Sequence, residues 1–124
     1  MKLLKSNKKK DLTIVTASFN IVSDLVGSVD YEIIHLGGIV RPKINGTVGP
    51  IAERALQDLH VDKAILGVNG VSTSFGYSVP GSYEASLKKL MIQSAKQTIV
   101  LADHTKFGKS YLCRIAPIEG ADYL

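Results

Sequence analysis

The sequence lacks the marks of secreted and membrane proteins. Its 124 residues contain one cysteine, Cys113, so no disulfide can form within the chain, which fits a reducing, cytosolic setting. No apolar run approaches the roughly 20 residues that a membrane-spanning helix needs. The three histidines are scattered without the spacing of metal ligands. We therefore expect a cytoplasmic protein without membrane contact, metal or cofactor.

Positive charge is also scarce once the first ten residues are set aside. The formal net charge is +4, but five of the 15 basic residues are lysines of that segment, which leaves 10 against 11 acidic residues. Such a neutral body lacks the clustered basic face that grips a nucleic-acid backbone. We interpret residues 1–10 as a solvated basic tail or linker remnant, with contact to nucleic acid as the alternative. Residues 11–124 are predicted to form one domain.

What the sequence does have is an alternation of strand-like and helix-like segments. Short apolar runs predict strands over 12–16, 32–36, 63–68, 98–102 and 111–116. Helical periodicity lies between the first four of these runs, over 20–26, 50–59 and 87–96. In the last helix Lys88 and Lys89 fall on the polar face, and residues 69–82 are predicted to be a loop. This pattern is typical of an α/β fold with a mostly parallel, open sheet and helices on both faces.

The loops after four predicted strands share one composition of small, hydroxyl-bearing and charged residues. Because the carboxyl ends of parallel strands meet at one edge of a sheet, we expect these loops to converge. Glycines and hydroxyl residues let backbone N–H groups approach an anion, and a lysine or arginine adds a charge-assisted hydrogen bond. The loops therefore predict a pocket for a phosphorylated, polyhydroxylated small molecule. The candidate ligand-binding residues are Thr16, Ser18, Gly37, Gly38, Arg41, Gly70, Asp103 and Lys106.

Each candidate also has a structural explanation. Gly37-Gly38 can serve only as a turn, and Ser18 can cap the helix that follows it. Asp103 can cap a short turn that leaves Lys106 in solvent. We nevertheless expect most from the Asp-x-x-Lys run, because it can offer one anion and one cation on the same side of a helical turn.

Five stretches occur in an order that resembles a known family. They are residues 13–20, 36–41, 48–52, 61–71 and 101–108, and they include Leu36-Gly37-Gly38-Ile39-Val40-Arg41 and Leu101-Ala102-Asp103-His104-Thr105-Lys106-Phe107-Gly108. Together they resemble the C-terminal sensor domain of the DeoR family of bacterial transcriptional regulators. The resemblance implies a fold like that of ribose-5-phosphate isomerase and the CoA transferases. It also implies a phosphorylated sugar or related metabolite as effector, with a homo-oligomer expected.

The chain departs from the family pattern in two respects. Nothing in it matches the family's N-terminal helix-turn-helix, and an earlier strand that ends in an Asp-Ser-Gly-Thr-Thr-like turn is missing. We expect a sensor domain that is incomplete at its N-terminal edge and reaches operator DNA through a helix-turn-helix outside this chain.

Two other functions stay open from sequence. The first alternative is a sugar-phosphate isomerase-like enzyme on the same fold, which needs a carboxylate base. The predicted pocket offers Asp103 for this role, with Glu84 a distant second, and no P-loop or nucleophile elbow is present. The second alternative is a pure oligomerisation domain. We favour the sensor and expect no enzyme activity.

Overall fold

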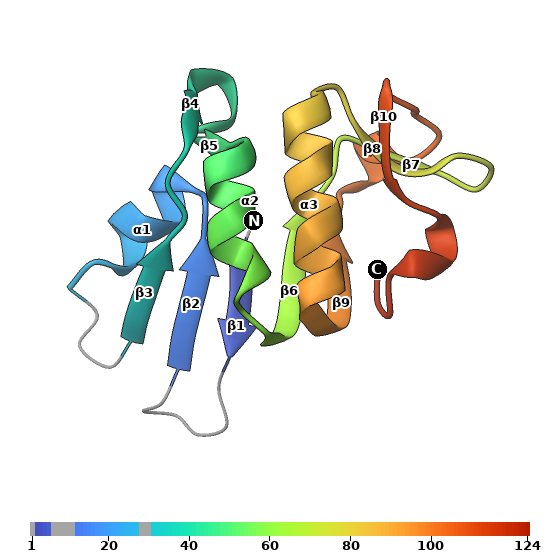
Figure 1. The fold of residues 1–124 in the computed structure, drawn as a ribbon. Coiled ribbons are helices and arrows are strands. Elements are labelled where there is room, and N and C mark those ends of the chain that lie inside the picture. Colours follow the sequence, from blue (N-terminus) through green and yellow to red (C-terminus); the bar gives the residue numbers. More distant parts are fainter. Residues whose placement is uncertain (1, 6–11, 28–30) are drawn as a thin grey trace.

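Four of the five strands in the main sheet run in the same direction, and the α/β fold that the sequence predicts is confirmed (Figure 1). The computed structural model describes residues 2–5, 12–27 and 31–124. Its five-stranded sheet has the order β3-β2-β1-β6-β9. Parallel pairing joins β2 to β3 and β6 to β9, whereas β1 is antiparallel to both of its neighbours. The strands are β1 (Lys2–Lys5), β2 (Leu12–Thr16), β3 (Tyr31–His35), β6 (Val61–Gly67) and β9 (Ala95–Leu101).

Strand β1 comes from the segment that the sequence predicts to be a basic tail. It lies in the middle of the sheet, where Lys2 is in register with Thr16 of β2 and with Ile65 of β6. Residues 6–11 lie outside the described part of the chain. The structure therefore gives Lys2–Lys5 a place in the sheet, and the division into tail and domain stays a prediction.

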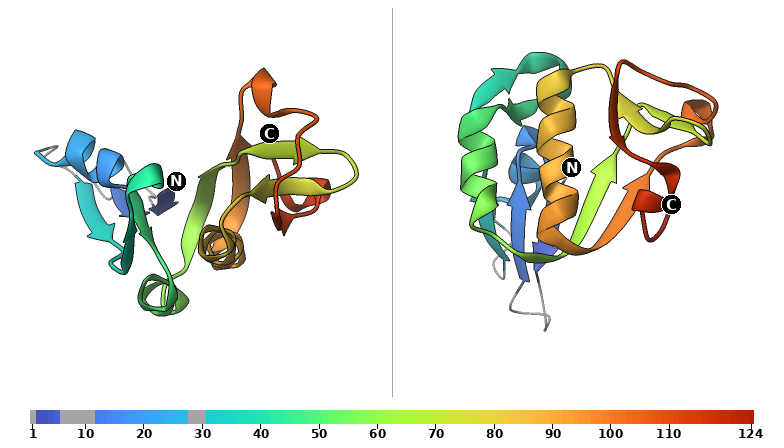
Figure 2. Two further views of the ribbon diagram at one scale, coloured as in Figure 1. Left: turned by 90° about the horizontal axis from the view of Figure 1, so that it is seen from above. Right: turned by 45° about the vertical axis from the view of Figure 1, so that its right-hand side comes forward.

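Helices cover both faces of this sheet (Figure 2). Helix α1 (Phe19–Leu25) lies on one face, and α2 (Pro50–Gln57) and α3 (Ser82–Ser94) lie side by side on the other. Helix α3 starts earlier than the predicted segment 87–96, and its last turn passes directly into β9. None of the helices in the described ranges is long and apolar enough to cross a bilayer.

Two small antiparallel units replace regions that the sequence predicts to be loop. A hairpin of β4 (Ile39–Arg41) and β5 (Gly46–Val48) encloses the short helix η1 (Pro42–Ile44). A three-stranded sheet contains β7 (Gly70–Ser72), β8 (Gly76–Val79) and β10 (Cys113–Ala116). The prediction that 69–82 is a loop is therefore wrong, and the predicted strand 111–116 starts later and pairs with β8.

Glycine residues in and beside β7 and β8 explain why apolar runs did not predict these two strands of the smaller sheet. Gly76 has a φ of +94°, which favours glycine, and a Cβ there would lie 2.2 Å from the carbonyl oxygen of Ala116. Short strands that contain such residues carry no continuous apolar signal.

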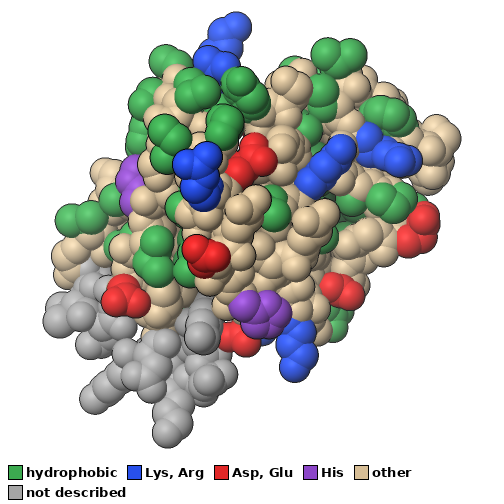
Figure 3. All heavy atoms as spheres, in the orientation of Figure 1, with side chains coloured by type: hydrophobic (Ala, Val, Ile, Leu, Met, Phe, Trp, Pro, Cys, Tyr) green, Lys and Arg blue, Asp and Glu red, His purple; other side chains and the backbone are tan. Residues whose placement is uncertain are grey.

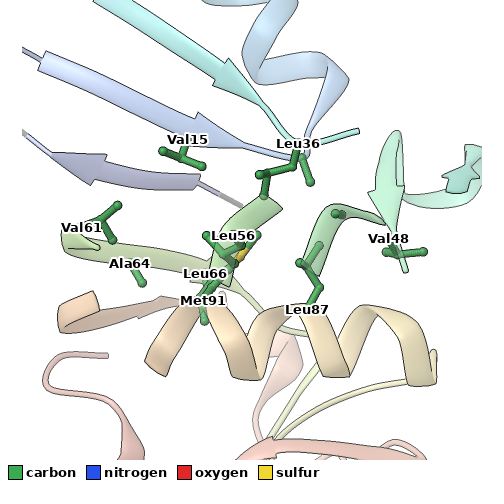
Figure 4. Close-up of a cluster of buried hydrophobic side chains, with 11 residues drawn as sticks. Val15, Leu36, Val48, Leu56, Val61, Ala64, Leu66, Leu87 and Met91 are labelled. Atoms are coloured by element: carbon green, nitrogen blue, oxygen red, sulfur yellow. The ribbon is translucent and has the colours of Figure 1, made fainter. Parts of the chain in front are cut away.

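The main core lies between the sheet and the helices α2 and α3 (Figure 4). Leu56 from α2 and Leu87 and Met91 from α3 meet Leu66 of β6, and each of these side chains is fully buried. A second cluster lies under the smaller sheet and includes Tyr77, Val79 and Ile115. This packing fixes α3 against β6, and the candidate site lies where these two elements meet.

Candidate functional site

A cavity of about 530 Å³ opens between the β4–β5 hairpin and the start of α3. The hairpin contributes Arg41 and Lys43, and Asn69 enters from the loop after β6. The start of α3 contributes the remaining polar side chains, Ser82, Tyr83 and Glu84. This mixture of cations, hydroxyls and a carboxylate is suited to a polar, negatively charged ligand.

A smaller cavity of about 150 Å³ adjoins the first one. The two cavities share Ile44 and Glu84, and the smaller one adds Ser18, Gly67 and Lys88. Ser18 follows β2 and Gly67 ends β6, so the smaller cavity lies at the carboxyl ends of two parallel strands. That is the edge at which open α/β sheets bind ligands. We call the two together the joined cavities.

The hairpin side of the joined cavities carries the exposed positive charge. The Arg41 guanidinium carbon lies 5.8 Å from the ring centroid of Tyr83, a cation–π distance that holds the arginine beside α3. Lys43, in η1, is also exposed at this cavity. The wider surface is mixed in charge: on the face drawn in Figure 3, cationic and anionic side chains are scattered singly. On this face, positive charge is not gathered into one large patch.

The α3 side of the joined cavities holds a buried ion pair. The Lys88 ammonium lies 2.9 Å from the Glu84 carboxylate, and the exposed fractions of the two side chains are 6% and 14%. Lys88 also donates a hydrogen bond of 2.6 Å to the Gly67 carbonyl at the end of β6. The prediction that Lys88 lies on the polar face of its helix is therefore wrong. The long side chain reaches back over the sheet edge, where the carbonyl and Glu84 compensate its charge.

Of the eight predicted ligand-binding residues, Ser18 and Arg41 line the joined cavities. Ser18 also accepts a hydrogen bond of 3.3 Å from the backbone N–H of Ile21, so the expectation that it caps α1 is confirmed. The fully buried Thr16 supports this turn, because its hydroxyl accepts a hydrogen bond of 3.0 Å from the Ser18 N–H.

The three predicted glycines lie outside the lining of the joined cavities. Gly37 and Gly38 follow β3, and a Cβ on Gly38 would lie 2.6 Å from the Val48 carbonyl oxygen. Gly70 begins β7, and a Cβ there would lie 2.5 Å from the Lys109 carbonyl oxygen. Close backbone packing explains Gly38 and Gly70 without a ligand.

Asp103 and Lys106 belong to a different part of the molecule. Asp103 caps the short helix η2 (His104–Lys106), and its carboxylate accepts hydrogen bonds from the hydroxyl and the backbone N–H of Thr105. These two bonds, aided by the charges of Lys106 and His104, hold the pKa of Asp103 below its ordinary value. Figure 2 shows η2 on the side of the main sheet opposite α2 and α3. The structure thus confirms the capping role of Asp103 and does not bring the Asp-x-x-Lys run to the joined cavities.

Several lining residues were not among the ligand-binding residues predicted from sequence, and three of them carried a usable signal. Glu84 and Lys88 are four residues apart, which is the spacing of an ion pair on one helix face. Asn69 follows the predicted strand 63–68 directly, as a strand-end ligand group should. Tyr83 had no such signal, because its position depends on where α3 begins.

The fold and the joined cavities define a class: an α/β ligand-binding domain with its cavity at the strand ends. Comparison with known families makes this specific. Residues 2–124 match the family model described as the DeoR C terminal sensor domain, and the chain belongs to that family. The resemblance seen in the sequence is thereby confirmed.

Relatives of this chain are named as transcriptional regulators. The chain is 35% identical over 114 residues to the HTH-type transcriptional repressor GlcR of Bacillus subtilis, covering 92% of this chain and 44% of the relative. It is 32% identical over 115 residues to the HTH-type transcriptional regulator GlpR of Haloferax volcanii, covering 91% and 45%. It is 26% identical over 112 residues to the glycerol-3-phosphate regulon repressor of Escherichia coli, covering 90% and 44%. The chain thus spans less than half the length of the curated relatives it matches.

Proposed function

We propose that this domain binds a phosphorylated sugar or a related metabolite in the joined cavities and thereby changes the operator affinity of a regulator. The DNA contact is made by a helix-turn-helix outside this chain. Membership of the sensor family supports this proposal, as does the name of one relative, a glycerol-3-phosphate regulon repressor. The expected homo-oligomer stays a prediction.

The observation that carries the proposal is the placement of Arg41 and Lys43 opposite the start of α3. Both cations are exposed at the cavity, so they can offer charge-assisted hydrogen bonds to a phosphate. The N-cap of α3 is Gly81, which has no side chain to accept from the first-turn N–H groups. The N–H groups of the first helical turn and the helix dipole favour an anion at that point. Two independent sources of positive potential therefore face one cavity.

The roles of the remaining sequence candidates stay predictions. A ligand role for Asp103 and Lys106 requires an anion at η2, away from the joined cavities. A role for Gly37, Gly38 and Gly70 requires contact through their backbone. We propose Ser18 and Arg41 as ligand contacts and Thr16 as the residue that positions Ser18.

We also propose that the domain does not turn its ligand over. Aldose–ketose isomerisation needs a carboxylate base that can take a proton from carbon. Glu84 is the carboxylate found in the joined cavities, and it is engaged by the Lys88 ammonium. Incubation with pentose and hexose phosphates, followed by NMR, should show only the background rate. Sustained conversion that Glu84→Gln abolishes would contradict this proposal and support the isomerase hypothesis.

Thermal melts with matched ligand pairs test the binding proposal. Glycerol 3-phosphate, ribose 5-phosphate and fructose 1-phosphate are each compared with the unphosphorylated compound and with inorganic phosphate. A ligand at 100 times its Kd should add about 2.7 kcal/mol to the free energy of unfolding. We expect at least one sugar phosphate to raise Tm well above its free counterpart. Equal shifts with the free compounds, or no shift with any phosphate, would contradict the proposal.

A matched pair of arginine variants locates the binding. Arg41→Ala should reduce the shift given by the sugar phosphate, whereas Arg54→Ala on the exposed side of α2 should leave it unchanged. In the full-length regulator, Arg41→Ala should leave operator binding in place but insensitive to the ligand. If the sugar phosphate raised the Tm of both variants equally, the result would show that the phosphate does not bind at Arg41.

A further inference from the structure

We propose that the Glu84–Lys88 pair recognises a hydroxyl group of the effector. The ligand would then lie with its phosphate at Arg41 and Lys43 and its hydroxyl-bearing end over the pair. This inference rests on the proposed function, because it assigns an orientation and a specificity to the same joined cavities.

The position of the pair is the first argument. Glu84 lines both cavities and Lys88 lines the smaller one, so the pair lies where the two cavities meet. Both side chains are nearly buried, yet they reach the cavity surface. Nearly buried charged groups are costly to desolvate unless hydrogen bonds satisfy them, and a ligand in the cavity can supply the bonds that the pair itself does not.

The second argument is the hydrogen-bonding capacity that the pair retains. An ammonium has three donors, and Lys88 uses two of them, on Glu84 and on the Gly67 carbonyl. A carboxylate can accept about four hydrogen bonds, and Lys88 provides one of those to Glu84. Among the described residues, one ammonium donor and several carboxylate acceptor sites are therefore left on two groups that are paired at 2.9 Å, and the helix spacing of four residues fixes their relative orientation.

The third argument concerns which ligand group fits. A hydroxyl can donate to the Glu84 carboxylate and accept from the Lys88 ammonium at once. A second phosphate is disfavoured, because the Lys88 charge is already compensated and Glu84 repels an anion. An apolar group would cover the remaining donor and acceptor sites of the pair without giving them a hydrogen bond. The contrast between the neutral pair and the two exposed cations, Arg41 and Lys43, sets the direction of the ligand.

The simpler possibility is that the pair only fastens α3 to the end of β6. The bond from Lys88 to Gly67 has that effect in any case. A purely structural pair would change the binding of every ligand to the same extent when altered. A pair that contacts a hydroxyl would discriminate between ligands that have it and ligands that lack it.

The experiment is titration calorimetry on this chain, in which the affinities of a ligand and its analogues are compared between wild type and variants. The probe is whichever of glycerol 3-phosphate, ribose 5-phosphate and fructose 1-phosphate binds most tightly, together with its singly deoxygenated analogues. Variants are Glu84→Gln, which is isosteric, and Lys88→Met, with Lys89→Met as the exposed neighbouring control. Tm without ligand checks folding, and if Lys88→Met does not fold, Glu84→Gln alone carries the test.

We expect wild type to bind the parent compound at least about tenfold more tightly than one deoxy analogue. Glu84→Gln should lose about tenfold for the parent and leave that analogue unchanged. Equal loss for both compounds, or no loss for either, would overturn this inference while the phosphate proposal stands if Arg41→Ala still weakens binding. Failure of every phosphorylated probe to bind wild type would overturn both proposals.

Discussion

Two regions of this domain carry a carboxylate and a lysine within one helical turn. They differ in the burial of these side chains and in whether a cavity lies beside them. On α3, Glu84 and Lys88 form a nearly buried ion pair at 2.9 Å beside a cavity. On η2, Asp103 turns to Thr105, and Lys106 lies outside the lining of the joined cavities. The comparison teaches that spacing alone does not make a site. Burial and an adjacent cavity distinguish the Glu84–Lys88 pair, a candidate ligand contact, from Asp103, which caps an exposed turn.

The largest expected effect is on stability, from removal of the buried cation. Lys88→Ala leaves the Glu84 carboxylate and the Gly67 carbonyl without their partner, and it should lower the free energy of unfolding by about 3 kcal/mol. Lys106→Ala on η2 should change it by less than about 0.5 kcal/mol. Urea denaturation of both variants and of Lys89→Ala measures the difference. Similar losses for Lys88→Ala and Lys106→Ala would remove the contrast between the regions.

The second effect is on ligand affinity, and it compares the two cations that sequence reasoning proposed. Arg41→Ala removes a charge-assisted hydrogen bond worth about 1.5–3 kcal/mol, which corresponds to a loss of about ten- to a hundredfold. Lys106 carries the same sequence-based prediction but lies on η2. We therefore expect the larger loss for Arg41→Ala in titration calorimetry with a sugar phosphate. The reverse order would restore the Asp-x-x-Lys run as the anion contact.

A smaller effect compares a cap with an uncapped position in the same helix. Ser18 caps α1 and lines the smaller cavity, so Ser18→Ala should cost about 1 kcal/mol of stability. Ser23→Ala, on the exposed side of α1, is the matched control and should be close to neutral. Urea denaturation distinguishes them, and equal stabilities would show that the cap contributes little.

The smallest effect is the pH dependence of the Asp103 cap. Hydrogen bonds from Thr105 lower the folded-state pKa of Asp103, so its contribution to stability is present above the ordinary pKa of about 4. That contribution is lost as the pH falls through the folded-state pKa. The gap in Tm between wild type and Asp103→Ala should therefore be small at pH 7 and should close in more acidic buffer. A gap that widens in acid would show that the sign is wrong.

Much of the main sheet was predictable, because its parallel strands are apolar and its helices periodic. The run Leu12–Thr16 is predicted with the bounds that β2 has in the structure. The small strands β4, β5, β7 and β8 were not predictable in this way, because each has only three or four residues, and β5, β7 and β8 contain glycine with serine or threonine. Elements of this length depend on tertiary pairing rather than on local pattern.

The candidate site was predictable in kind and only partly in its residues. The rule that strand ends converge placed Ser18 and Arg41 correctly at the joined cavities. It did not place Asp103 and Lys106 there, because the chain after β9 turns to the opposite side of the sheet. The polar–apolar pattern assigned Lys88 to solvent, because lysine counts as polar in any such pattern. The pattern does not show that the fold places a carbonyl and a carboxylate beside the Lys88 ammonium.

The most direct test of the account is a crystal structure of this chain with the sugar phosphate that gives the largest rise in Tm. The account predicts the phosphate between Arg41, Lys43 and the start of α3, with a ligand hydroxyl within hydrogen-bond distance of Glu84 and Lys88. A phosphate bound instead against Lys106 on η2 would contradict it.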